Sequence, residues 1–389
     1  YSDGKLYTRA KKRGHVMEAL IWLVAHGASS DILIDAHPHI GTNMLPKIIS
    51  EMRSTIIRSG GEVRFCTKLI DFSINSGAIS GATLLDVASG AKEEFATEHI
   101  VLATGHSARD IFHLLHSKNL ALEAKPFALG VRVEHPQSFI DQRQYHGESR
   151  LNPQNEERLP AASYSLVCQI DGRGVHSFCM CPGGVVVTTP TEPGALCING
   201  MSHAARAGNY ANSALVVTVT PEDFAKAGHT GHFAGVQFQD DIERKAYVAG
   251  GGDFVAPANR VTDFLGGKTS QDLPATSYRR GLTPFPIQEI YPAPVIQALK
   301  QGLERFNGKM RGFVTDEAKL IGVETRTASP VRVIRDHETR EAAGISGLYP
   351  MGEGMGYGGG IASAAIDGMR SADACLVALG GEEEQIQPK

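Results

Sequence analysis

Cysteine, tryptophan and long apolar runs are all scarce in this sequence. Six of the 389 residues are cysteine and one is tryptophan. So little cysteine does not make the disulfide framework of a secreted domain, and we therefore expect reduced thiols and a cytoplasmic location. The longest apolar stretch, residues 19–25 around Trp22, is too short to cross a bilayer. We expect no membrane partner.

The chain also lacks an excess of charge of either sign. It carries 38 lysines and arginines against 42 aspartates and glutamates, for a formal net charge of −4. There is no basic stripe or arginine-rich arm, so we expect no nucleic-acid partner. With 42% hydrophobic and 21% charged residues, the composition is that of a globular protein. The length exceeds what one compact core usually supports, which predicts two domains.

Hydrophobic periodicity predicts both helices and strands. A helix over residues 15–26 ends at the C-cap Gly27, and a second helix begins after an N-cap at Asn43 and stops at Gly60-Gly61. From about Pro126, strand-like runs alternate with glycine- and proline-rich loops, which predicts an inserted mixed-sheet domain. The second helix is expected to bury Leu45, Ile48, Ile49, Met52 and Ile56 on one face. Further strands are predicted over residues 62–65, 69–74, 79–85, 94–96, 99–103, 128–133, 163–169, 184–188, 215–219, 330–334 and 347–350, and further helices over 107–115, 295–307 and 361–379.

Glycine is abundant, with 43 residues, and its densest run lies between residues 347 and 365. A strand there ends at Gly352-Glu353-Gly354, and Gly358-Gly359-Gly360 opens an alanine-rich helix at Ile361. Glycines let a flat ligand approach the backbone, and the first amide groups of a helix favour negative charge. This arrangement suits a reduced flavin, with Glu353 accepting a hydrogen bond from a ribityl hydroxyl. The alternative is a glycine-rich turn before an ordinary core helix.

The apolar run over residues 99–103 leads directly into Thr104-Gly105. Such a run, bounded by glycine, is typical of a strand buried on both faces of a parallel sheet. A strand that ends in small residues leaves room at the carboxyl edge of the sheet, where cofactors bind in open α/β folds. Taken alone, the motif fits a plain strand–turn–helix connection equally well.

Cysteine and histidine pairs suggest further chemistry, each with a plainer alternative. Cys179 and Cys181 could exchange electrons near a flavin, or bind a metal with His176 or His203. The usual Cys-x-x-Cys spacing and a second metal-binding pair are both missing, so we favour two cysteines that shape a loop and strand, and predict no metal site. In His37-Pro38-His39, positioned loop histidines are favoured over a metal or acid–base role.

Several further stretches complete a pattern that spans nearly the whole chain. They are Ser2-Asp3-Gly4-Lys5-Leu6, His39-Ile40-Gly41-Thr42, Ala103-Thr104-Gly105-His106-Ser107-Ala108-Arg109-Asp110, Cys179-Met180-Cys181-Pro182-Gly183-Gly184, Asn199-Gly200-Met201-Ser202, Thr325-Arg326-Thr327-Ala328-Ser329-Pro330 and the glycine-rich segment 347–365. Together they resemble the family of uncharacterised FAD-dependent, or NAD(FAD)-utilising, dehydrogenases. That family is related to the two-dinucleotide-binding-fold flavoproteins of glutathione-reductase type.

The resemblance implies a set of cofactor-binding residues. Ser2, Asp3, Gly4 and Lys5 would lie in the loop beside the flavin, and Thr104 and Gly105 near the adenosine half of FAD. Gly352, Glu353 and Gly354 would hold the ribityl–phosphate region, and Gly358, Gly359, Gly360 and Ile361 the pyrimidine edge. Arg326 would approach the flavin from the second domain, where it could clamp an anionic substrate or stabilise reduced flavin; an ordinary arginine ion pair is the alternative.

The sequence departs from these flavoproteins in one respect. They carry G-x-G-x-x-G on their first strand, where a helix N-terminus binds the pyrophosphate, and no such unit occurs in these 389 residues. Because the match begins just after the place of that unit, we expect the chain to be truncated at its N-terminus.

These observations predict an α/β fold. We expect a Rossmann-like FAD-binding domain that is discontinuous and lacks its first βαβ unit, with an inserted α+β substrate or cap domain. The FAD-binding domain would comprise residues 1–125 and 331–380, the inserted domain residues 126–330, and a flexible tail residues 381–389.

The expected function is that of an FAD-dependent oxidoreductase, which transfers hydride or electrons between a small-molecule substrate and FAD. Candidate catalytic residues are Arg326, for anion binding, and His203 or Cys181, as a substrate-side group. NAD(P)H could donate the electrons, although no second dinucleotide fingerprint is visible. The alternatives are a flavin-binding protein without turnover, a flavin monooxygenase and a ring-saturating reductase. The sequence indicates neither the substrate nor the oligomeric state.

Overall fold

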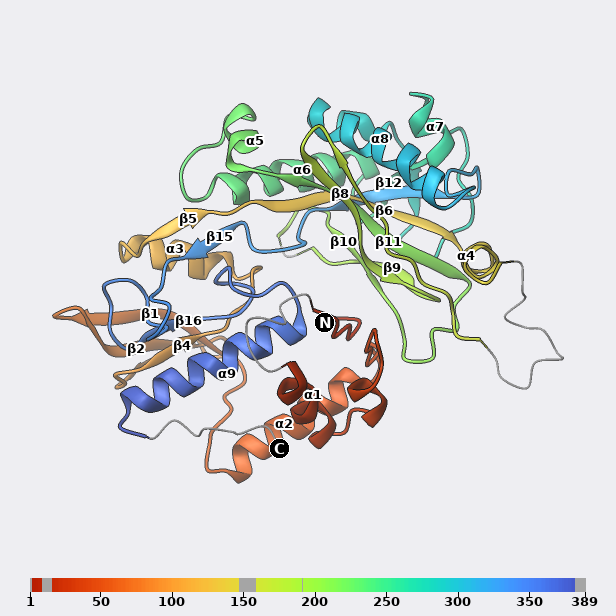
Figure 1. Ribbon diagram of the computed structural model, residues 1–389. Helices are drawn as coiled ribbons and strands as arrows, with labels where there is room; N and C mark the ends of the chain where they lie inside the picture. Colours follow the sequence, from red (N-terminus) through yellow and green to blue (C-terminus); the bar gives the residue numbers. More distant parts are fainter. Residues whose placement is uncertain (1, 9–15, 147–158, 191, 382–389) are drawn as a thin grey trace. The chain divides into compact units, whose positions relative to one another are not determined.

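The computed structural model of the chain (Figure 1) describes residues 2–8, 16–146, 159–190 and 192–381. Its contacts divide the chain into two compact units, each assembled from three segments. Unit 1 comprises Tyr1–Lys5, His39–Leu45 and Pro126–Thr327, and unit 2 comprises Leu6–Pro38, Pro46–Lys125 and Ala328–Lys389. Unit 1 therefore interrupts unit 2 in the sequence.

A seven-stranded mixed sheet forms the centre of unit 1, in the order β13-β12-β14-β6-β11-β8-β7. Its neighbouring strands are antiparallel except β12 and β13. The strands are β6 Phe127–Pro136, β7 Val167–Ile170, β8 Arg173–Cys181, β11 Tyr210–Val219, β12 Ala256–Arg260, β13 Leu282–Pro284 and β14 Lys319–Glu324. β6 and β11 pair along their whole length, which makes them the centre of the sheet.

Helices and a small second sheet cover the central strands of unit 1. Helices α6 and α8 pack on one face of the large sheet, and the β9–β10 pair lies against the other (Figure 1). Because both faces are covered, Ala214 to Val217 in β11 are all fully buried, as in a strand with no solvent face. The remaining elements of unit 1 are α4 Gln137–Gln144, α5 Pro221–Lys226, α6 Ala234–Gly250, α7 Val261–Leu265, α8 Ala293–Lys309, the 3-10 helix η2 Ile287–Glu289, β9 Val185–Thr188 and β10 Ile198–Met201.

Unit 2 combines small sheets with helices. Strands β1, β2 and β3 form an antiparallel meander, β15 pairs with β5 in antiparallel fashion, and β16 lies parallel to β4. Helix α9 packs beside α1 (Figure 1). The helices are α1 Val16–Ala25, the 3-10 helix η1 Ser30–Leu33, α2 Leu45–Arg58, α3 Arg109–Ser117 and α9 Ile361–Ala378, and the strands are β1 Thr67–Asn75, β2 Ala78–Asp86, β3 Lys92–Phe95, β4 Ile100–Leu102, β5 Leu122–Ala124, β15 Val331–Val333 and β16 Leu348–Pro350. The first residue of α2, Leu45, is grouped with unit 1.

The predicted α/β class is confirmed. In unit 2 the parallel pair β4–β16, followed by a glycine-rich loop and the long helix α9, is consistent with a Rossmann-like FAD-binding domain. Unit 1 resumes at Pro126, where the sequence predicts the inserted domain to begin, and it ends at Thr327, whereas the sequence predicts an end at residue 330. The roles of these domains in binding cofactor and substrate stay predictions.

Two short segments lie in a different unit from the one expected. The sequence assigns residues 2–5 and 39–45 to the FAD-binding domain, but the structure groups both with unit 1. Lys5 forms a β-bridge with His39, and the Thr42 N–H donates to the Ser202 carbonyl at 3.0 Å. Backbone pairing thus ties these segments to unit 1, and backbone pairing between segments so far apart leaves no local signal in the sequence.

Two details of α2 differ from the prediction. Of its apolar residues, Ile48 is fully buried, but Ile49 is 58% exposed and Ile56 is 50% exposed, so the expected buried face is only partly covered in the described structure. Asn43 does not cap the helix, because its side-chain oxygen accepts the Ala204 N–H at 2.9 Å and the helix begins only at Leu45.

Two predicted strands also need correction. Residues 62–65 form no strand; the Arg64 side chain there pairs with Glu62 and Glu93. The run 99–103 does form a parallel strand, β4, but Val101 is 44% exposed, so the strand is not buried on both faces. In the described part of the chain β4 pairs only with β16, and a two-stranded sheet leaves part of its surface uncovered. The predicted flexible tail covers residues 381–389, of which residues 382–389 lie outside the described part of the chain.

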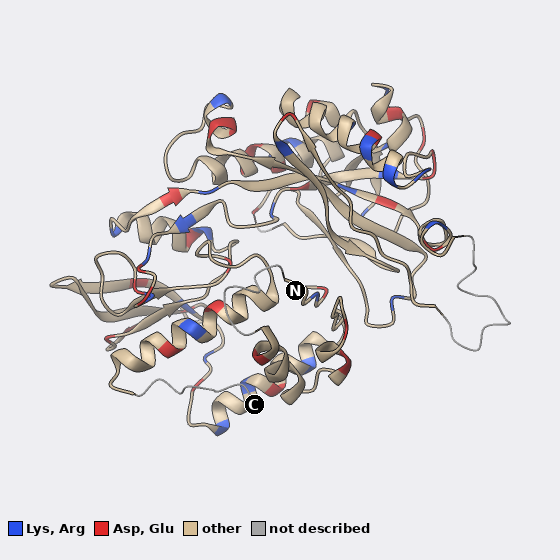
Figure 2. Cartoon of the chain, in the orientation of Figure 1, with Lys and Arg blue, Asp and Glu red and all other residues tan. Residues whose placement is uncertain are grey.

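Charged residues are spread over both units. Figure 2 shows basic and acidic residues interspersed along the ribbon, and helices α8 and α9 each carry residues of both signs. Across the described ranges, none of the helices combines the length and the apolar character needed to span a bilayer.

Candidate functional site

The carboxyl ends of β4 and β16 bring two of the predicted motifs together in unit 2. Leu102 lies opposite Pro350 in the parallel pair, and the Met351 N–H donates to the Leu102 carbonyl at 3.0 Å. Thr104-Gly105 and Gly352-Glu353-Gly354 therefore leave the same edge of the sheet. A Cβ atom on Gly354 would lie 2.4 Å from the Gly105 carbonyl oxygen, so only glycine allows the two turns to approach this closely.

The start of α9 is open. Gly360 is the N-cap, with φ 163° and ψ 176°, and no side chain caps this end of the helix. A Cβ atom added to Gly359 or Gly360 would meet nothing within 4 Å. Ser363, in the first turn, accepts the Gly359 N–H at 3.0 Å and donates to the Gly360 carbonyl at 3.1 Å. The first amide groups of the helix have no partner within the helix, and the two glycines beside them leave open the space that a Cβ would occupy.

A buried carboxylate fixes the loop between β16 and α9. Asp367 in α9 accepts the Gly352 N–H at 2.8 Å. Arg335 holds the same carboxylate at 2.5 and 3.0 Å and also donates to the Pro350 carbonyl at 2.6 Å. Burial alone would raise the pKa of Asp367, but the arginine and the Gly352 N–H outweigh it and lower the pKa. An ionised Asp367 therefore ties the end of β16 to α9.

Glu353 stands at the tip of this loop with its side chain partly exposed. Its carboxylate lies 3.8 Å from Nε2 of His106, which follows Thr104-Gly105. With the glycine approach and the uncapped helix start, these features form a cradle of backbone amides and small residues. Helix N-termini of this kind bind phosphate groups in proteins, and that this cradle holds a dinucleotide cofactor stays a prediction.

The predicted cofactor residues are divided between the two units. Thr104, Gly105, Gly352 to Gly354 and Gly358 to Ile361 lie in unit 2, whereas Ser2 to Lys5 lie in unit 1. In unit 1, Gly4 has φ 81°, and a Cβ there would lie 2.8 Å from the Gly41 N. Contact of any of these residues with a cofactor stays a prediction.

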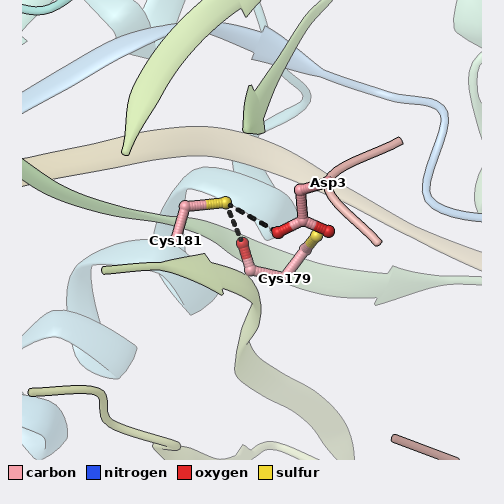
Figure 3. Close-up of side chains that lie close together, drawn as sticks. All are labelled: Asp3, Cys179 and Cys181. Carbon is pink, nitrogen blue, oxygen red and sulfur yellow. Dashed lines mark hydrogen bonds between the residues drawn. The ribbon is translucent and has the colours of Figure 1, made fainter. Parts of the chain in front are cut away.

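Lys5 and Asp3 lie against two cysteines of β8 in unit 1. Figure 3 shows Asp3 with Cys179 and Cys181. The Lys5 Nζ is 2.5 Å from Asp3 Oδ2, 3.3 Å from Cys179 Sγ and 3.2 Å from Cys181 Sγ. The Cys181 thiol also lies 3.5 Å from Asp3 and 3.3 Å from the Cys179 carbonyl oxygen. Burial opposes the charge on Lys5, but Cys181, Cys179 and Asp3 outweigh it and raise the pKa of the lysine.

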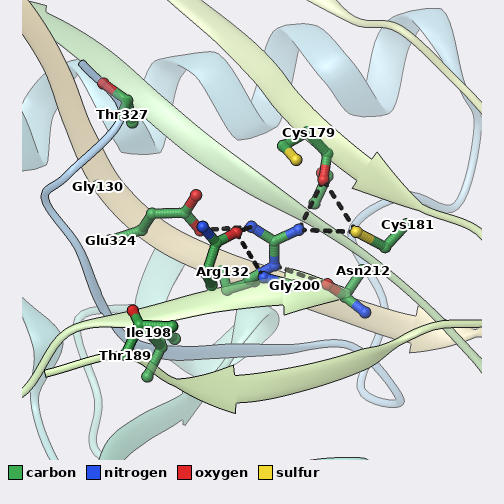
Figure 4. A network of polar contacts seen from close by, with 12 residues as sticks. Gly130, Arg132, Cys179, Cys181, Thr189, Ile198, Gly200, Asn212, Glu324 and Thr327 are labelled. Atoms are coloured by element: carbon green, nitrogen blue, oxygen red, sulfur yellow. Dashed lines mark hydrogen bonds and ion pairs between the residues drawn. The ribbon is translucent and has the colours of Figure 1, made fainter. Parts of the chain in front are cut away.

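A fully buried arginine supports this cluster from the sheet (Figure 4). Arg132 in β6 donates to Glu324 at 2.5 Å, to Asn212 at 2.6 Å, and through one nitrogen to the Cys179 carbonyl at 2.6 Å and Cys181 Sγ at 3.3 Å. Burial raises the pKa of Glu324 to about 7, and the guanidinium opposes this rise. The planar fork of the arginine thus holds a strand, a loop and a thiol in fixed positions.

The candidate catalytic residues have different surroundings. Cys181 is fully buried in the cluster, whereas His203 is exposed in the turn after β10. Arg326 donates to both carboxylate oxygens of the buried Glu243, at 2.8 and 2.6 Å. An arginine ion pair, the alternative for Arg326, is thus present, and a role in anion binding stays a prediction.

Sequence reasoning missed Arg132 and Glu324, and it did not connect Lys5 with the two cysteines. A signal for the arginine was available, because a charged residue inside a predicted buried strand needs a buried partner. Its partner lies 192 positions away in the chain, so the sequence could not identify it.

Comparison with known proteins shows the family to which this chain belongs. Residues 126–327 match the family model described as "FAD-dependent protein, C-terminal domain-like". An uncharacterized protein of Clostridium beijerinckii is 41% identical over 377 residues, which are 96% of this chain and 68% of that protein.

Solved structures show weaker likenesses. The glycerol-3-phosphate dehydrogenase of Bacillus halodurans, solved in complex with FAD, aligns at 11% identity and a TM-score of 0.38, over 98% of this chain and 57% of that chain. An oxidoreductase of Methanosarcina mazei aligns at 12% identity and a TM-score of 0.32, over 90% and 58%. The chain thus spans less than two thirds of either structure, and likenesses this weak assign no function.

Proposed function

We propose a function from the premise that the chain belongs to the family of FAD-dependent proteins matched by residues 126–327. The protein binds FAD and acts as an oxidoreductase that exchanges hydride or electrons between a small-molecule substrate and the flavin. The observation that supports this proposal is the open, uncapped start of α9 beside the carboxyl ends of β4 and β16.

Unit 2 supplies the residues proposed to hold the cofactor, except Ser2 to Lys5, which belong to unit 1. Gly358, Gly359, Gly360 and Ile361 present backbone amides and the positive end of the α9 dipole to the pyrimidine edge of the flavin. Gly352, Glu353 and Gly354 face the ribityl–phosphate region, where the Glu353 carboxylate accepts a hydroxyl hydrogen bond. Thr104 and Gly105 lie near the adenosine half, and Ser2 to Lys5 near the flavin. When bound, FAD supplies the two-electron chemistry, and the chain orients it and excludes water.

Three residues are proposed to act on the substrate side of the flavin. Cys181, His203 and Arg326 all belong to unit 1, and Arg326 serves an anionic substrate only if its pair with Glu243 leaves a donor available. NAD(P)H is proposed as the electron donor because the chemistry needs one.

The test is the visible absorption spectrum of the protein expressed from its complete reading frame and incubated with FAD. Oxidised flavin bands, bleached by a reductant and restored by an electron acceptor, are expected. Bands that never bleach with NAD(P)H or other donors would indicate a flavin-binding protein without turnover. Rapid reoxidation by oxygen with substrate hydroxylation would indicate a monooxygenase, and reduction of a substrate carbon–carbon double bond a ring-saturating reductase.

A further inference from the structure

Two cysteines of unit 1 lie close together between the half-buried Lys5 and the fully buried Arg132. Ligand atoms of Cys179, Cys181 and Asp3 all lie within 4.8 Å of one another. The Lys5 ammonium lies within 3.3 Å of both sulfur atoms. The Arg132 guanidinium lies 3.3 Å from Cys181 Sγ (Figure 4). The positive charge held among Asp3, Cys179 and Cys181 is therefore the ammonium group of Lys5, a residue of the chain itself.

An irregular stretch of β8 places both thiols on this side of the strand. The pairing with β11 shifts where Phe178 faces Ala214 and Cys181 faces Asn212, which is a β-bulge at Cys179 and Met180. Cys179 has φ 48°, a left-handed conformation that non-glycine residues rarely adopt. Strained backbone of this kind is found more often at functional positions than elsewhere.

The two thiols differ in access and in charge. Cys181 is fully buried, and Cys179 is partly exposed. The hydrogen bond from Cys181 lowers the pKa of Cys179, burial opposes this, and Lys5 lowers it further. Burial raises the pKa of Cys181 well above that of an ordinary thiol. The pair therefore combines a partly exposed thiol of lowered pKa with a buried thiol that donates to the Cys179 carbonyl oxygen, which is the arrangement of an attacking and a resolving cysteine.

We propose that Cys179 and Cys181 form a dithiol centre that reduces small-molecule disulfides. The Cys179 thiolate attacks one sulfur of the substrate, so a bond from Cys179 to that sulfur forms while the substrate sulfur–sulfur bond breaks. The other half leaves as a thiolate and takes a proton from solvent. Cys181 then gives up its proton and attacks Cys179, and the second half leaves as a thiol. The substrate gains two electrons, and the dithiol becomes a disulfide.

Lys5 is a positioning residue in this scheme. Its ammonium contacts both sulfurs, so it stabilises the thiolate before attack and the Cys181 thiolate during resolution. The exchange needs no flavin, so it succeeds or fails independently of the function proposed above.

The first experiment maps alkylation of each cysteine by iodoacetamide as a function of pH, using mass spectrometry of the full chain. Cys168 in the neighbouring strand β7 is the matched control, because it is also partly exposed but burial raises the pKa of its thiol. An ordinary thiol is only a few per cent ionised near pH 7, so Cys179 should react roughly tenfold faster or more. In Lys5→Met the pH profile of Cys179 should shift part of the way toward that of an ordinary thiol, because Lys5 is one of the groups that lower the Cys179 pKa, whereas a merely structural role would leave the profile in place.

The second experiment uses oxidised glutathione as the disulfide probe. The wild-type chain should lose two hydrogens within the 179–181 peptide and release two equivalents of glutathione. Cys181→Ser should stop at a mixed disulfide on Cys179, and Cys179→Ser should leave Cys181 unreacted. Cys168→Ser should behave as the wild type. Alkylation of Cys179 no faster than that of Cys168, the absence of the internal disulfide, or one tightly bound zinc per chain would each overturn the proposal.

Discussion

In the described part of unit 1, each buried charged side chain has a hydrogen-bonding or ion-pairing partner. The Arg326–Glu243 pair shows how such a partner affects stability. The Arg326 side chain is 7% exposed and Glu243 is fully buried, and two hydrogen bonds join them. Thr325 adds a third hydrogen bond to the same carboxylate at 2.6 Å. Removing the cation would leave a buried carboxylate unpaired, which is costlier than removing the whole pair.

Arg326→Met should therefore lower the free energy of unfolding by about 3–5 kcal/mol. The double variant Arg326→Met with Glu243→Gln should recover much of this loss, because no buried charge then lacks a partner. Urea denaturation of the three proteins measures both effects. A loss below about 1 kcal/mol in the single variant would show that the pair contributes little and would leave Arg326 available for a ligand.

A second prediction concerns His135 in β6. The ring is fully buried, Nε2 donates to the Phe313 carbonyl at 2.8 Å, and burial lowers the pKa to about 4. Between pH 6.5 and 4 the unfolded chain therefore binds more protons at this residue than the folded chain does, and stability falls as the pH falls. From pH 7 to pH 4.5 this residue should cost about 2–3 kcal/mol.

His135→Gln removes the titration and keeps a donor for the carbonyl. The free energy of unfolding of the wild type should fall more steeply than that of the variant over this pH range, by the amount given above. Parallel pH profiles for the two proteins would contradict the low pKa assigned to His135.

Among the elements, the approach of β10 to β6 depends on Gly200. A Cβ atom there would lie 2.1 Å from Arg132 Nη2 and 2.2 Å from Asn212 Oδ1. Gly200→Ala would push the guanidinium out of its hydrogen bonds and should lower the free energy of unfolding by at least about 1–3 kcal/mol.

The matched control is Gly308→Ala in α8, where the added methyl meets nothing within 4 Å. Alanine should be neutral there, or stabilising by up to about 1 kcal/mol, because the site is helical. Thermal unfolding compares the two substitutions directly. Equal effects would show that Arg132 has more freedom than the contacts indicate.

Elements with a strong local pattern could be predicted from the sequence. The run into Gly27 gave α1, and the glycine-to-alanine transition at residue 361 gave the first residue of α9. The long helix α6 was not predicted, because it buries residues of mixed polarity, such as Gln239 and Glu243, and so lacks a clean apolar stripe. The exposure of Val101 was not predictable either, since it depends on how many strands flank β4.

At the scale of the whole molecule, the order of motifs along the sequence predicted the fold class, but the sequence did not predict contacts between residues far apart in the chain. The α/β class and the start of the longest segment of unit 1 at Pro126 follow from the change, along the chain, to short strand-like runs between glycine- and proline-rich loops. The cluster of Lys5, Arg132, Cys181 and Glu324 does not, because its contacting members lie 49 to 192 residues apart and meet only after the sheet of unit 1 forms.

The central claim is that a flavin docks against the bare amides at the start of α9. Its most direct test is the dissociation constant for FAD of Gly360→Val, compared with the wild type and Gly308→Ala, by flavin fluorescence titration of the protein from its complete reading frame. Gly360 is extended and a Cβ atom there would meet no protein atom within 4 Å, so valine should leave the free energy of unfolding within about 1 kcal/mol of the wild type. The account predicts FAD affinity reduced by roughly tenfold or more in Gly360→Val alone, which corresponds to about 1.4 kcal/mol. Unchanged affinity in a stably folded variant would contradict it.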